Sequence, residues 1–507
     1  MMESKKIKSA LISVYYKDNL EEIVQLLNKY GVTIYSTGGT LEFIKNITEA
    51  SSVESLTGYP SILGGRVKTL HPKVFGGILS RRDNVSDKED LEKYEIPEID
   101  LVIVDLYPFS ETLASGATHE EIVEKIDIGG ISLIRAAAKN YKDTLIISSR
   151  EQYGAFAELL QTKNGSTDPD DRRRYATEAF DVTTTYDRHI SDYFNSLTDK
   201  RRFTLNVYPA NKLRYGENPH QKGVFYGRLD DIFTQLHGKE ISYNNLLDID
   251  AAFALINDFS EPTYAVIKHN NACGCASDDN PLEAWKKALA GDPVSAFGGI
   301  IITNRKTDRQ CAEEINKLFF EIILAPEYTE DALTILKSKK NRIILELKSG
   351  KRPKEQFRSV LNGVLVQETD SVTEDDSYLK TVTKKTPETQ EINDLIFANK
   401  LVKHSKSNSI VLAKNQQLLA SGVGQTSRVD ALKQAIDKAK SFGFSLTGAV
   451  MASDAFFPFP DCVEIASKEG IRAIVQPGGS VKDQDSIEVC DREGLSMVFT
   501  GYRHFKH

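Results

Sequence analysis

Apolar and polar positions alternate in blocks along the N-terminal part of the chain. Short apolar runs at 8–14, 32–36, 100–106 and 144–149 are typical of buried strands, and the segment 18–30 carries leucine and isoleucine at helical spacing. Strands that alternate with helices form parallel sheets joined by crossover connections. The pattern therefore predicts an α/β unit at the start of the chain.

The end of this unit is predicted from a change of pattern. A turn-rich stretch, KNGSTDPDD, precedes a long segment in which apolar residues recur at helical spacing: Tyr175, Ala179, Val182, Tyr186, Ile190 and Tyr193. The charged stretch TDKRR at 198–202 follows and is the expected seam. We therefore expect one domain at 1–199 and a second at 200–507.

The second region is also mixed α/β and repeats itself loosely. YAVIKHNNACG, a helix and DPVSAFGGIII resemble in layout SIVLAKN, the helix after SRVDALKQA, and TGAVMASDAFFPF. Such a repeat favours a duplicated fold, with chance similarity as the alternative. The expected subdomains are approximately 200–370 and 380–507, separated by the acidic stretch 369–380.

Composition narrows the possible functions. The 507 residues carry 64 basic and 72 acidic side chains, a net charge of −8, which gives no general attraction for nucleic acid. No segment approaches the roughly 18 apolar residues of a membrane span. Five cysteines, an odd number, favour reduced thiols and a cytoplasmic protein. We expect neither a nucleic-acid nor a membrane partner.

Polar residues in the first domain gather where its first two predicted strands end. Ser13 and Lys17 follow the first strand, and a glycine-rich turn follows the second: Ser36, Thr37, Gly38, Gly39 and Thr40. Backbone amides of such a turn at a helix start can hold an anion, and ligands bind at the carboxyl edge of parallel sheets. An ordinary strand-to-helix turn is the alternative.

Three further motifs add charge and proton-transfer groups. GGRVKTLHP contains Arg66 and Lys68, LYPF places Tyr107 at a strand end, and DIGGISLIRAAAKN places Asp127 before a helix that reaches Lys139. The simpler interpretations are a solvated loop for the first motif, a capping aromatic for the second and a helix cap for the third. Together they predict an anion cradle, cations, a tyrosine and a carboxylate in one domain.

The motif IKHNNACG, at 267–274, places Lys268 and His269 at the end of an apolar run. Zinc deaminases combine His-x-Glu with Pro-Cys-x-x-Cys. Here Asn271 stands at the glutamate position, two residues after the histidine, and the cysteines are spaced Cys273-x-Cys275. A metal site is therefore not expected. An adjacent lysine and histidine suit proton transfer and stabilisation of a developing negative charge.

Polar clusters are dense in the rest of the second region: RYGENPHQ, YNNLLDID, SAFGG, KSNSI, GQTSRVD, SDAFFPFPD, QPGGS and GYRHFKH. So many loop-type clusters favour a binding site. The aromatic FFPF could hold a flat heterocycle.

These motifs, in this order from about Ser13 to His507, resemble the family of bifunctional purine biosynthesis proteins that join AICAR transformylase to IMP cyclohydrolase. The resemblance implies formyl transfer from 10-formyltetrahydrofolate to AICAR, then dehydrative closure of formyl-AICAR to IMP. It implies an N-terminal doubly wound domain of the methylglyoxal-synthase type and a duplicated cytidine-deaminase-like domain without zinc. It also implies a homodimer with the transformylase site shared between subunits, and no catalytic metal.

The resemblance also assigns residues. It implies a cyclohydrolase group of Lys68, Tyr107, Asp127 and Lys139, with the nucleotide phosphate held by Ser13, Lys17, Ser36, Thr37, Gly38, Gly39, Thr40 and Arg66. It places Lys268 and His269 at the transformylase centre. AICAR is expected near Arg214, Tyr215, Asn245, Gly298, Phe456 and Arg503, and folate near Asn408, Pro458 and Phe459.

The first loop departs from the family pattern. SVYYKDNL stands where the family usually has SVSDKTGL, which introduces Tyr15, Tyr16 and Asn19. Elsewhere in the same domain, Asp105 stands where the family more often has asparagine. A transformylase with an impaired cyclohydrolase site is therefore an alternative. A purine-nucleotide-binding regulator without turnover and a zinc deaminase are the others.

Overall fold

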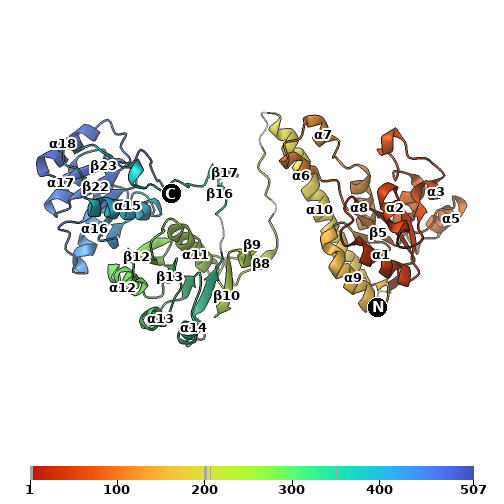
Figure 1. Cartoon of the computed structure of the whole chain (residues 1–507), viewed down its shortest axis with the longest axis horizontal. Helices are drawn as coiled ribbons and strands as arrows, with labels where there is room; N and C mark the ends of the chain where they lie inside the picture. The colour runs from red at the N-terminus through yellow and green to blue at the C-terminus, as the bar shows by residue number, and fades with distance from the viewer. Residues whose placement is uncertain (1–3, 199–201, 206, 349–351) are drawn as a thin grey trace. The chain divides into compact units, whose positions relative to one another are not determined.

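A computed structural model describes residues 4–198, 202–205, 207–348 and 352–507. The chain divides into two units, Met1–Asn206 and Val207–His507, which form the red-to-yellow and green-to-blue parts of Figure 1. The predicted boundary between residues 199 and 200 lies outside the described residues. None of the described helices is both long and apolar enough to cross a membrane.

The first unit is built on a five-stranded sheet in the order β4-β3-β2-β5-β6, and every neighbouring pair is parallel. The strands are β2 (Ser9–Ser13), β3 (Thr33–Ser36), β4 (Ser51–Ser52), β5 (Leu101–Val104) and β6 (Leu145–Ile147). Four of them lie within the predicted apolar runs. A separate antiparallel pair joins β1 (Lys5–Lys6) to β7 (Ser166–Thr167).

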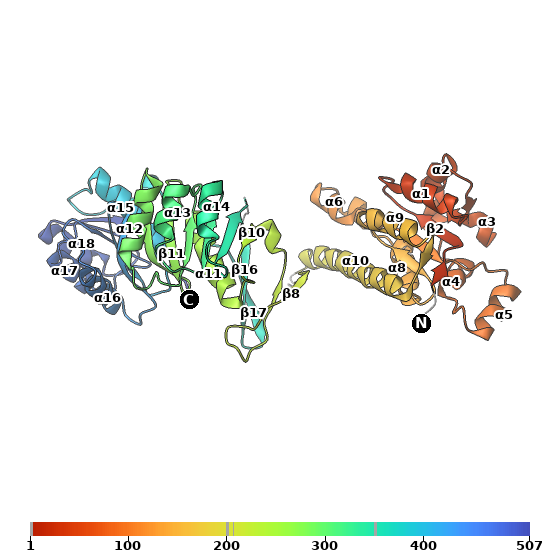
Figure 2. The ribbon, with the colours of Figure 1, turned by 90° about the horizontal axis from the view of Figure 1, so that it is seen from below.

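Helices cover both faces of this sheet, which confirms the doubly wound α/β fold (Figures 1 and 2). One apolar cluster packs Ile23 of α1 and Phe156 of α9 against one face, and another packs Leu133 of α8 and Ala176 of α10 against the other. The helices are α1 (Leu20–Lys29), α2 (Gly38–Lys45), α3 (Val53–Thr57), α4 (Pro72–Leu79), α5 (Val85–Lys93), α6 (Phe109–Ala114), α7 (His119–Val123), α8 (Gly129–Lys139), α9 (Tyr153–Thr162) and α10 (Pro169–Ser196), with 3₁₀ turns η1 (Leu63–Gly65) and η2 (Arg150–Gln152).

The second unit is built on a 12-stranded sheet in the order β10-β15-β14-β13-β11-β12-β20-β19-β21-β22-β23-β18. Its strands are β10 (Phe233–His237), β11 (Thr263–Lys268), β12 (Asn271–Ser277), β13 (Ile300–Thr303), β14 (Ile322–Ala325), β15 (Ile343–Leu347), β18 (Lys380–Thr381), β19 (Ile410–Lys414), β20 (Gln417–Gly422), β21 (Val450–Ser453), β22 (Ala473–Gln476) and β23 (Ser496–Phe499).

The strand order shows that this sheet is duplicated. Each half has an antiparallel hairpin, β11–β12 or β19–β20, whose first strand runs antiparallel to the first of three parallel strands. An antiparallel edge strand, β10 or β18, closes each half. The halves meet where Ala276 of β12 pairs with Gln417 of β20. The loose sequence repeat therefore reflects a real structural repeat; its likeness to cytidine deaminases stays a prediction.

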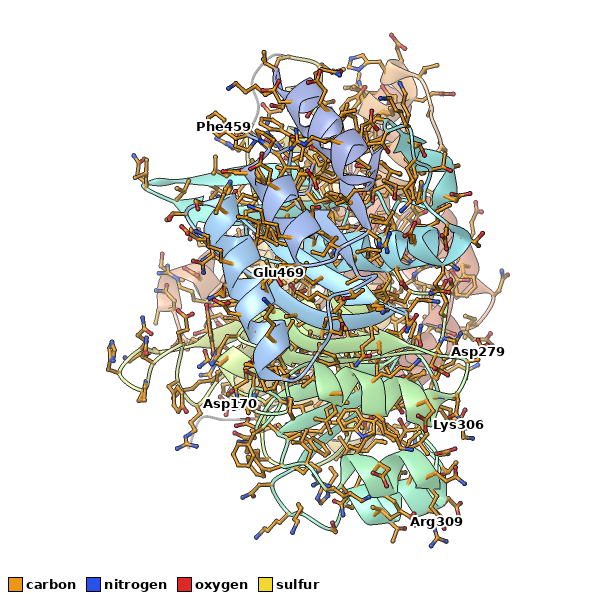
Figure 3. All side chains as sticks on the ribbon, turned by 90° about the vertical axis from the view of Figure 1, so that its left-hand side faces the viewer. Asp170, Asp279, Lys306, Arg309, Phe459 and Glu469 are labelled. Carbon is orange, nitrogen blue, oxygen red and sulfur yellow. The ribbon has the colours of Figure 1, made fainter. Side chains whose placement is uncertain are left out.

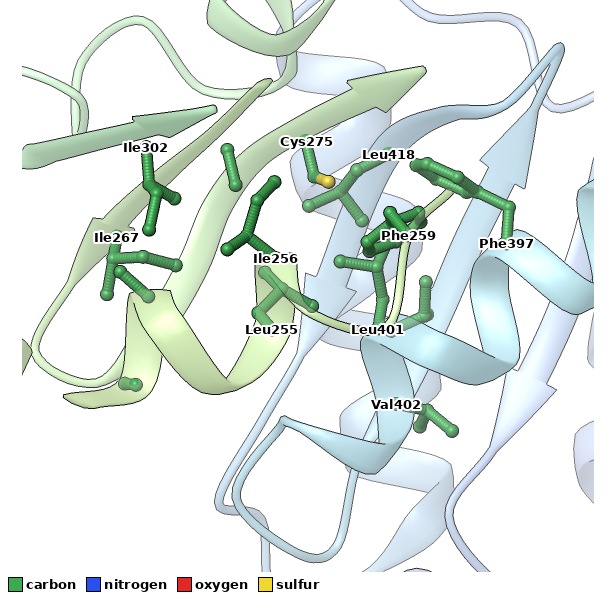
Figure 4. Packing of buried hydrophobic residues seen from close by; sticks show 14 of the residues in the cluster. Leu255, Ile256, Phe259, Ile267, Cys275, Ile302, Phe397, Leu401, Val402 and Leu418 are labelled. Atoms are coloured by element: carbon green, nitrogen blue, oxygen red, sulfur yellow. The ribbon is translucent and has the colours of Figure 1, made fainter. Parts of the chain in front are cut away.

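Alternating strand residues supply a core on each face of the sheet. On one face, α11 (Tyr243–Ile256) and α15 (Thr389–Lys403) share a cluster that runs across both halves, including Phe259, Cys275 and Leu418 (Figure 4). The other face is covered by α12 (Pro281–Gly291), α13 (Arg309–Ile315) and α14 (Glu330–Leu336) in the first half, and by α16 (Arg428–Ser441), α17 (Asp461–Lys468) and α18 (Asp483–Glu493) in the second.

Two small antiparallel hairpins lie outside the large sheet. They are β8 (Ala210–Lys212) with β9 (Val224–Tyr226), and β16 (Glu355–Val360) with β17 (Gly363–Glu368). Every residue of β16 and β17 is exposed, although several are apolar, such as Leu365 and Val366. The 3₁₀ turns η3 (Leu229–Asp231) and η4 (Asp376–Tyr378) complete the second unit's described elements.

Candidate functional site

The first unit contains a cavity of about 730 Å³ at the carboxyl ends of β2, β3 and β5. Its walls include ten of the predicted residues: Ser13, Lys17, Thr37, Gly38, Gly39, Thr40, Arg66, Lys68, Tyr107 and Asp127. Parallel strands bring these residues together because their carboxyl ends meet at one edge of the sheet.

The amino end of α2 forms one wall of this cavity. Thr37 precedes the helix, but its hydroxyl lies 2.9 Å from the Ser13 hydroxyl and does not cap the helix. The first-turn amides of a helix have no partner within the helix, and its dipole favours an anion there. Ser36 is buried and donates to the Ile12 carbonyl at 2.7 Å, so it supports the turn from behind.

Cationic side chains line the same cavity as this helix end, and a Cβ placed on Gly38 would lie 3.9 Å from the Lys68 ammonium. The Lys17 ammonium donates to the backbone carbonyls of Val14 and Tyr15 at 2.7 and 2.8 Å, and burial lowers its pKa against the opposing effect of Asp105. Arg66 pairs with Glu124 across 3.0 Å, and both side chains are largely exposed. The cavity can therefore hold an anionic group between backbone donors and lysine.

A carboxylate lies at the amino end of a second helix, α8. Asp127 accepts from the Gly130 N–H at 2.6 Å, while its own N–H donates to the Tyr186 hydroxyl at 2.9 Å. Burial raises the pKa of Asp127, against backbone hydrogen bonds and the charge of Lys68 that lower it. Burial and Asp127 also raise the pKa of Tyr107. A buried carboxylate with a raised pKa is a stronger proton acceptor than an exposed one.

Lys139 is placed differently from the other predicted residues of this site. It is the last residue of α8, its side chain is exposed, and it is not among the residues that line the cavity.

Two residues without a predicted role shape the cavity. Tyr15 lines it and is 42% exposed. Asp105, also in the wall, accepts from the backbone N–H groups of Tyr15 and Tyr16, the latter at 2.9 Å, and so holds the altered loop. Their departure from the family pattern was the only sign of this in the sequence.

Lys268 and His269 lie together at the end of β11 in the second unit. The Lys268 ammonium donates to the Phe297 carbonyl at 2.7 Å. His269 is exposed and begins the turn between β11 and β12, with φ 49°. The pair therefore combines an oriented cation with an accessible imidazole.

Of the residues expected near AICAR, Gly298 lies beside this pair, and others belong to or contact helix α11. A Cβ placed on Gly298 would approach the Lys268 ammonium to 3.3 Å, and φ 70° at this residue also favours glycine. Asn245, in the first turn of α11, donates to Glu321 at 3.2 Å. The segment 214–221, which precedes α11 in the chain, contains Arg214 and Tyr215. It contacts α11 through a 3.1 Å hydrogen bond from the Asn244 side chain to the Glu217 carbonyl.

The remaining predicted residues belong to the second half of the sheet. Asn408 accepts from Arg428 at 3.1 Å, and the neighbouring Lys406 N–H donates to Asn271 at 3.3 Å, which links this loop to the hairpin that follows His269. Phe456 is half-buried, whereas the loop residues Pro458, Phe459 and Arg503 are exposed. Phe459, labelled in Figure 3, is 53% exposed, and the Lys482 ammonium lies 4.7 Å from its ring centroid.

The cysteines near the lysine-histidine pair are not grouped with other metal-binding side chains. Burial raises the pKa of the Cys273 thiol to about 12 and that of Cys275 further still. Within the described ranges, no three or more His, Cys, Asp or Glu side chains gather as a metal site would require.

Two family models and several known proteins match this chain. Residues 137–438 match the AICARFT/IMPCHase bienzyme family, and residues 19–132 match the MGS-like domain. The chain is 62% identical over 508 residues to the bifunctional purine biosynthesis protein PurH of Bacteroides thetaiotaomicron, with both chains fully covered. It is 47% identical to the PurH proteins of Caldicellulosiruptor bescii and Aquifex aeolicus, covering 99% and 98% of this chain and all of each relative.

Proposed function

The chain belongs to the AICARFT/IMPCHase bienzyme family, and we propose that its two units divide the two reactions between them. The protein is a bifunctional enzyme of purine biosynthesis, an AICAR formyltransferase and an IMP cyclohydrolase that uses a formyl-folate co-substrate. The observation that carries the proposed division is that the cavity and the lysine-histidine pair belong to different units.

We assign ring closure to the cavity of the first unit. The phosphate of formyl-AICAR binds at the amino end of α2, where backbone donors and Lys17 converge. Closure requires the carboxamide nitrogen to lose a proton while the formyl oxygen gains negative charge. Asp127 accepts the proton, and Lys68 and Tyr107 stabilise the oxygen. Lys139 remains assigned by resemblance alone.

We assign formyl transfer to Lys268 and His269. The AICAR amine is a weak nucleophile because its lone pair is delocalised into the ring and the carboxamide. His269 accepts its proton as it attacks the formyl carbon of 10-formyltetrahydrofolate. Lys268 stabilises the resulting oxyanion or protonates the departing folate nitrogen. AICAR then binds along α11 and Gly298, and folate beside Asn408, Pro458 and Phe459.

We further propose that the protein is a cytoplasmic homodimer. The five cysteines are unpaired thiols, as expected in a reducing compartment. The exposed β16–β17 hairpin supports dimer formation, because exposed apolar strands are an association risk that a partner surface removes. Light scattering after gel filtration tests it, with Leu365→Asp expected to favour monomers and exposed Lys340→Asp as the control.

Separate assays of the two half-reactions test the assignment. Purified protein is given AICAR with 10-formyltetrahydrofolate in one assay and synthetic formyl-AICAR in the other. Turnover in both is expected. Formyl transfer without IMP formation would instead favour the alternative of an impaired cyclohydrolase, which Tyr15 in the cavity wall makes worth testing.

A further inference from the structure

The duplicated sheet contains a second copy of the hairpin that carries His269. β11–β12 and β19–β20 are both antiparallel hairpins with a register shift at the same place, between Val266 and Ile267 in the first and between Leu412 and Ala413 in the second. In each hairpin the first strand ends with a lysine, and two turn residues follow it. Lys268, His269 and Asn270 therefore correspond to 414–416.

The two lysines make the same contact. Lys268 donates to the Phe297 carbonyl at 2.7 Å, and Lys414 donates to the Thr447 carbonyl at 2.7 Å. Each acceptor precedes a glycine with positive φ, 70° at Gly298 and 76° at 448. This lysine placement is therefore a feature of the repeated fold, and the histidine is what distinguishes the first copy.

Both turns adopt a backbone conformation that must be held in place. The central residues have φ 49° and 63° at His269 and Asn270, and 54° and 52° at Asn415 and Gln416. Two consecutive positive φ values are typical of type I′ turns, in which residues other than Gly, Asn and Asp are unfavourable. Because the His269 side chain is exposed, packing does not orient it, and its direction depends on this backbone.

A carboxylate from the preceding helix holds each turn. In the second copy, Asp394 of α15 accepts from the Asn415 and Gln416 N–H groups at 2.8 and 2.7 Å. In the first copy, Asp248 of α11 accepts from the Asn270 N–H at 2.7 Å. The Asn270 side-chain amide, oriented with its nitrogen towards the helix, reaches the Leu247 carbonyl at 3.0 Å and Asp248 at 3.1 Å.

We propose that Asp248 is a positioning residue for formyl transfer, which holds the turn so that the His269 imidazole faces the reacting amine. The proposal rests on the assignment of formyl transfer to His269. The same helix carries Asn245, three residues before Asp248, so one rigid element sets both the predicted substrate contact and the imidazole. Asp394 holds the corresponding turn of the second hairpin, which carries no histidine.

The equivalence of the two carboxylates provides a matched control. Asp248→Ala, Asp394→Ala and Asp248→Asn are made in the full-length protein, and melting temperature, formyl-transfer kcat, KM for AICAR and formyl-AICAR cyclisation are measured. Both alanine variants are expected to lower the melting temperature, Asp394→Ala at least as much as Asp248→Ala because Asp394 accepts from two backbone N–H groups. Only Asp248→Ala is expected to lower formyl-transfer kcat, by about ten-fold or more, because small misplacements of catalytic groups are costly. KM for AICAR and cyclisation stay near wild type.

Asp248→Asn keeps an oxygen that can accept from Asn270, so it is expected to retain most of the formyl-transfer activity. If Asp248→Ala does not fold, Asp248→Ala/Asn270→Gly replaces it, since glycine adopts positive φ without strain but leaves the turn unanchored. An unchanged kcat in the alanine variant, or an equal loss in Asp394→Ala, overturns the proposal. His269→Ala separates the two failures: if it retains formyl transfer, the assignment of His269 itself is wrong.

Discussion

The ring of Tyr15 lies edge-on to that of Tyr107 in the wall of the first unit's cavity, with ring centroids 5.8 Å apart and planes inclined by 66°. The Lys125 ammonium lies 5.5 Å from the Tyr15 ring centroid. The tyrosine that departs from the family pattern is thus packed beside a predicted catalytic group. It adds an aromatic surface that a flat heterocycle can contact.

Tyr15→Ser is expected to raise KM for formyl-AICAR by roughly 2- to 10-fold, because an aromatic contact contributes about 0.5–1.5 kcal/mol. kcat for ring closure should stay close to wild type. Steady-state cyclisation kinetics measure both. Tyr16→Phe is the control, since the Tyr16 hydroxyl donates to Glu111 at 2.6 Å and its ring does not line the cavity. A higher kcat in Tyr15→Ser would mean that the ring obstructs the site.

Asp105→Asn is expected to lower the free energy of unfolding by about 1–3 kcal/mol and to raise KM for formyl-AICAR. The Asp105 carboxylate accepts from the N–H groups of both Tyr15 and Tyr16, whereas an asparagine would present its amide nitrogen to one of them. Urea unfolding and cyclisation kinetics check this. The exposed Asp18→Asn in the same loop is the matched control. Equal effects of the two substitutions would show that Asp105 does not hold the loop.

His269→Ala and Lys68→Met are expected to separate the two activities. The first should lower formyl transfer by about 10²- to 10⁴-fold through loss of the proton acceptor, and leave cyclisation of supplied formyl-AICAR near wild type. The second should lower cyclisation by about 10²- to 10³-fold through loss of a cation at the developing oxyanion, and spare formyl transfer. Both half-reactions are assayed on each variant. Parallel loss of both activities in either variant would contradict the division between units.

Local patterns predicted the first unit well because its sheet is parallel and buried. The apolar runs at 8–14 and 100–106 contain β2 and β5, and ligand-type residues after such strands meet at one edge. Asn19 stands before α1 where the family usually has glycine, and its φ of 60° is one that asparagine tolerates.

Long-range hydrogen bonds could not be predicted in this way. Asp248 was part of a polar cluster and Asp105 ended an apolar run, but their roles depend on which backbone N–H groups the fold brings near them. The correspondence of His269 with Asn415 likewise becomes definite only through the register of the two hairpins. A sequence repeat of two short segments carries too little information to fix that register.

His504 is expected to make the second unit sensitive to alkaline pH. Its Nδ1 lies 2.6 Å from Asp370 and its Nε2 2.8 Å from Glu374, and the residue is only 3% exposed. Burial lowers the pKa of His504, but the hydrogen bonds and charges of the two carboxylates outweigh it and raise the pKa to about 9. The protonated imidazole is therefore favoured in the folded protein.

Because this folded-state pKa lies above the usual value of 6.5, the stabilisation is complete below pH 6.5 and is lost as pH rises through about 9. The loss amounts to roughly 3 kcal/mol between those limits. Urea unfolding at pH 6 and pH 10 measures it, with His504→Asn expected to show a smaller difference in the free energy of unfolding between the two pH values. His507→Asn, at the exposed chain end, should keep the wild-type difference. If His504→Asn keeps it as well, other titrating groups cause the alkaline destabilisation.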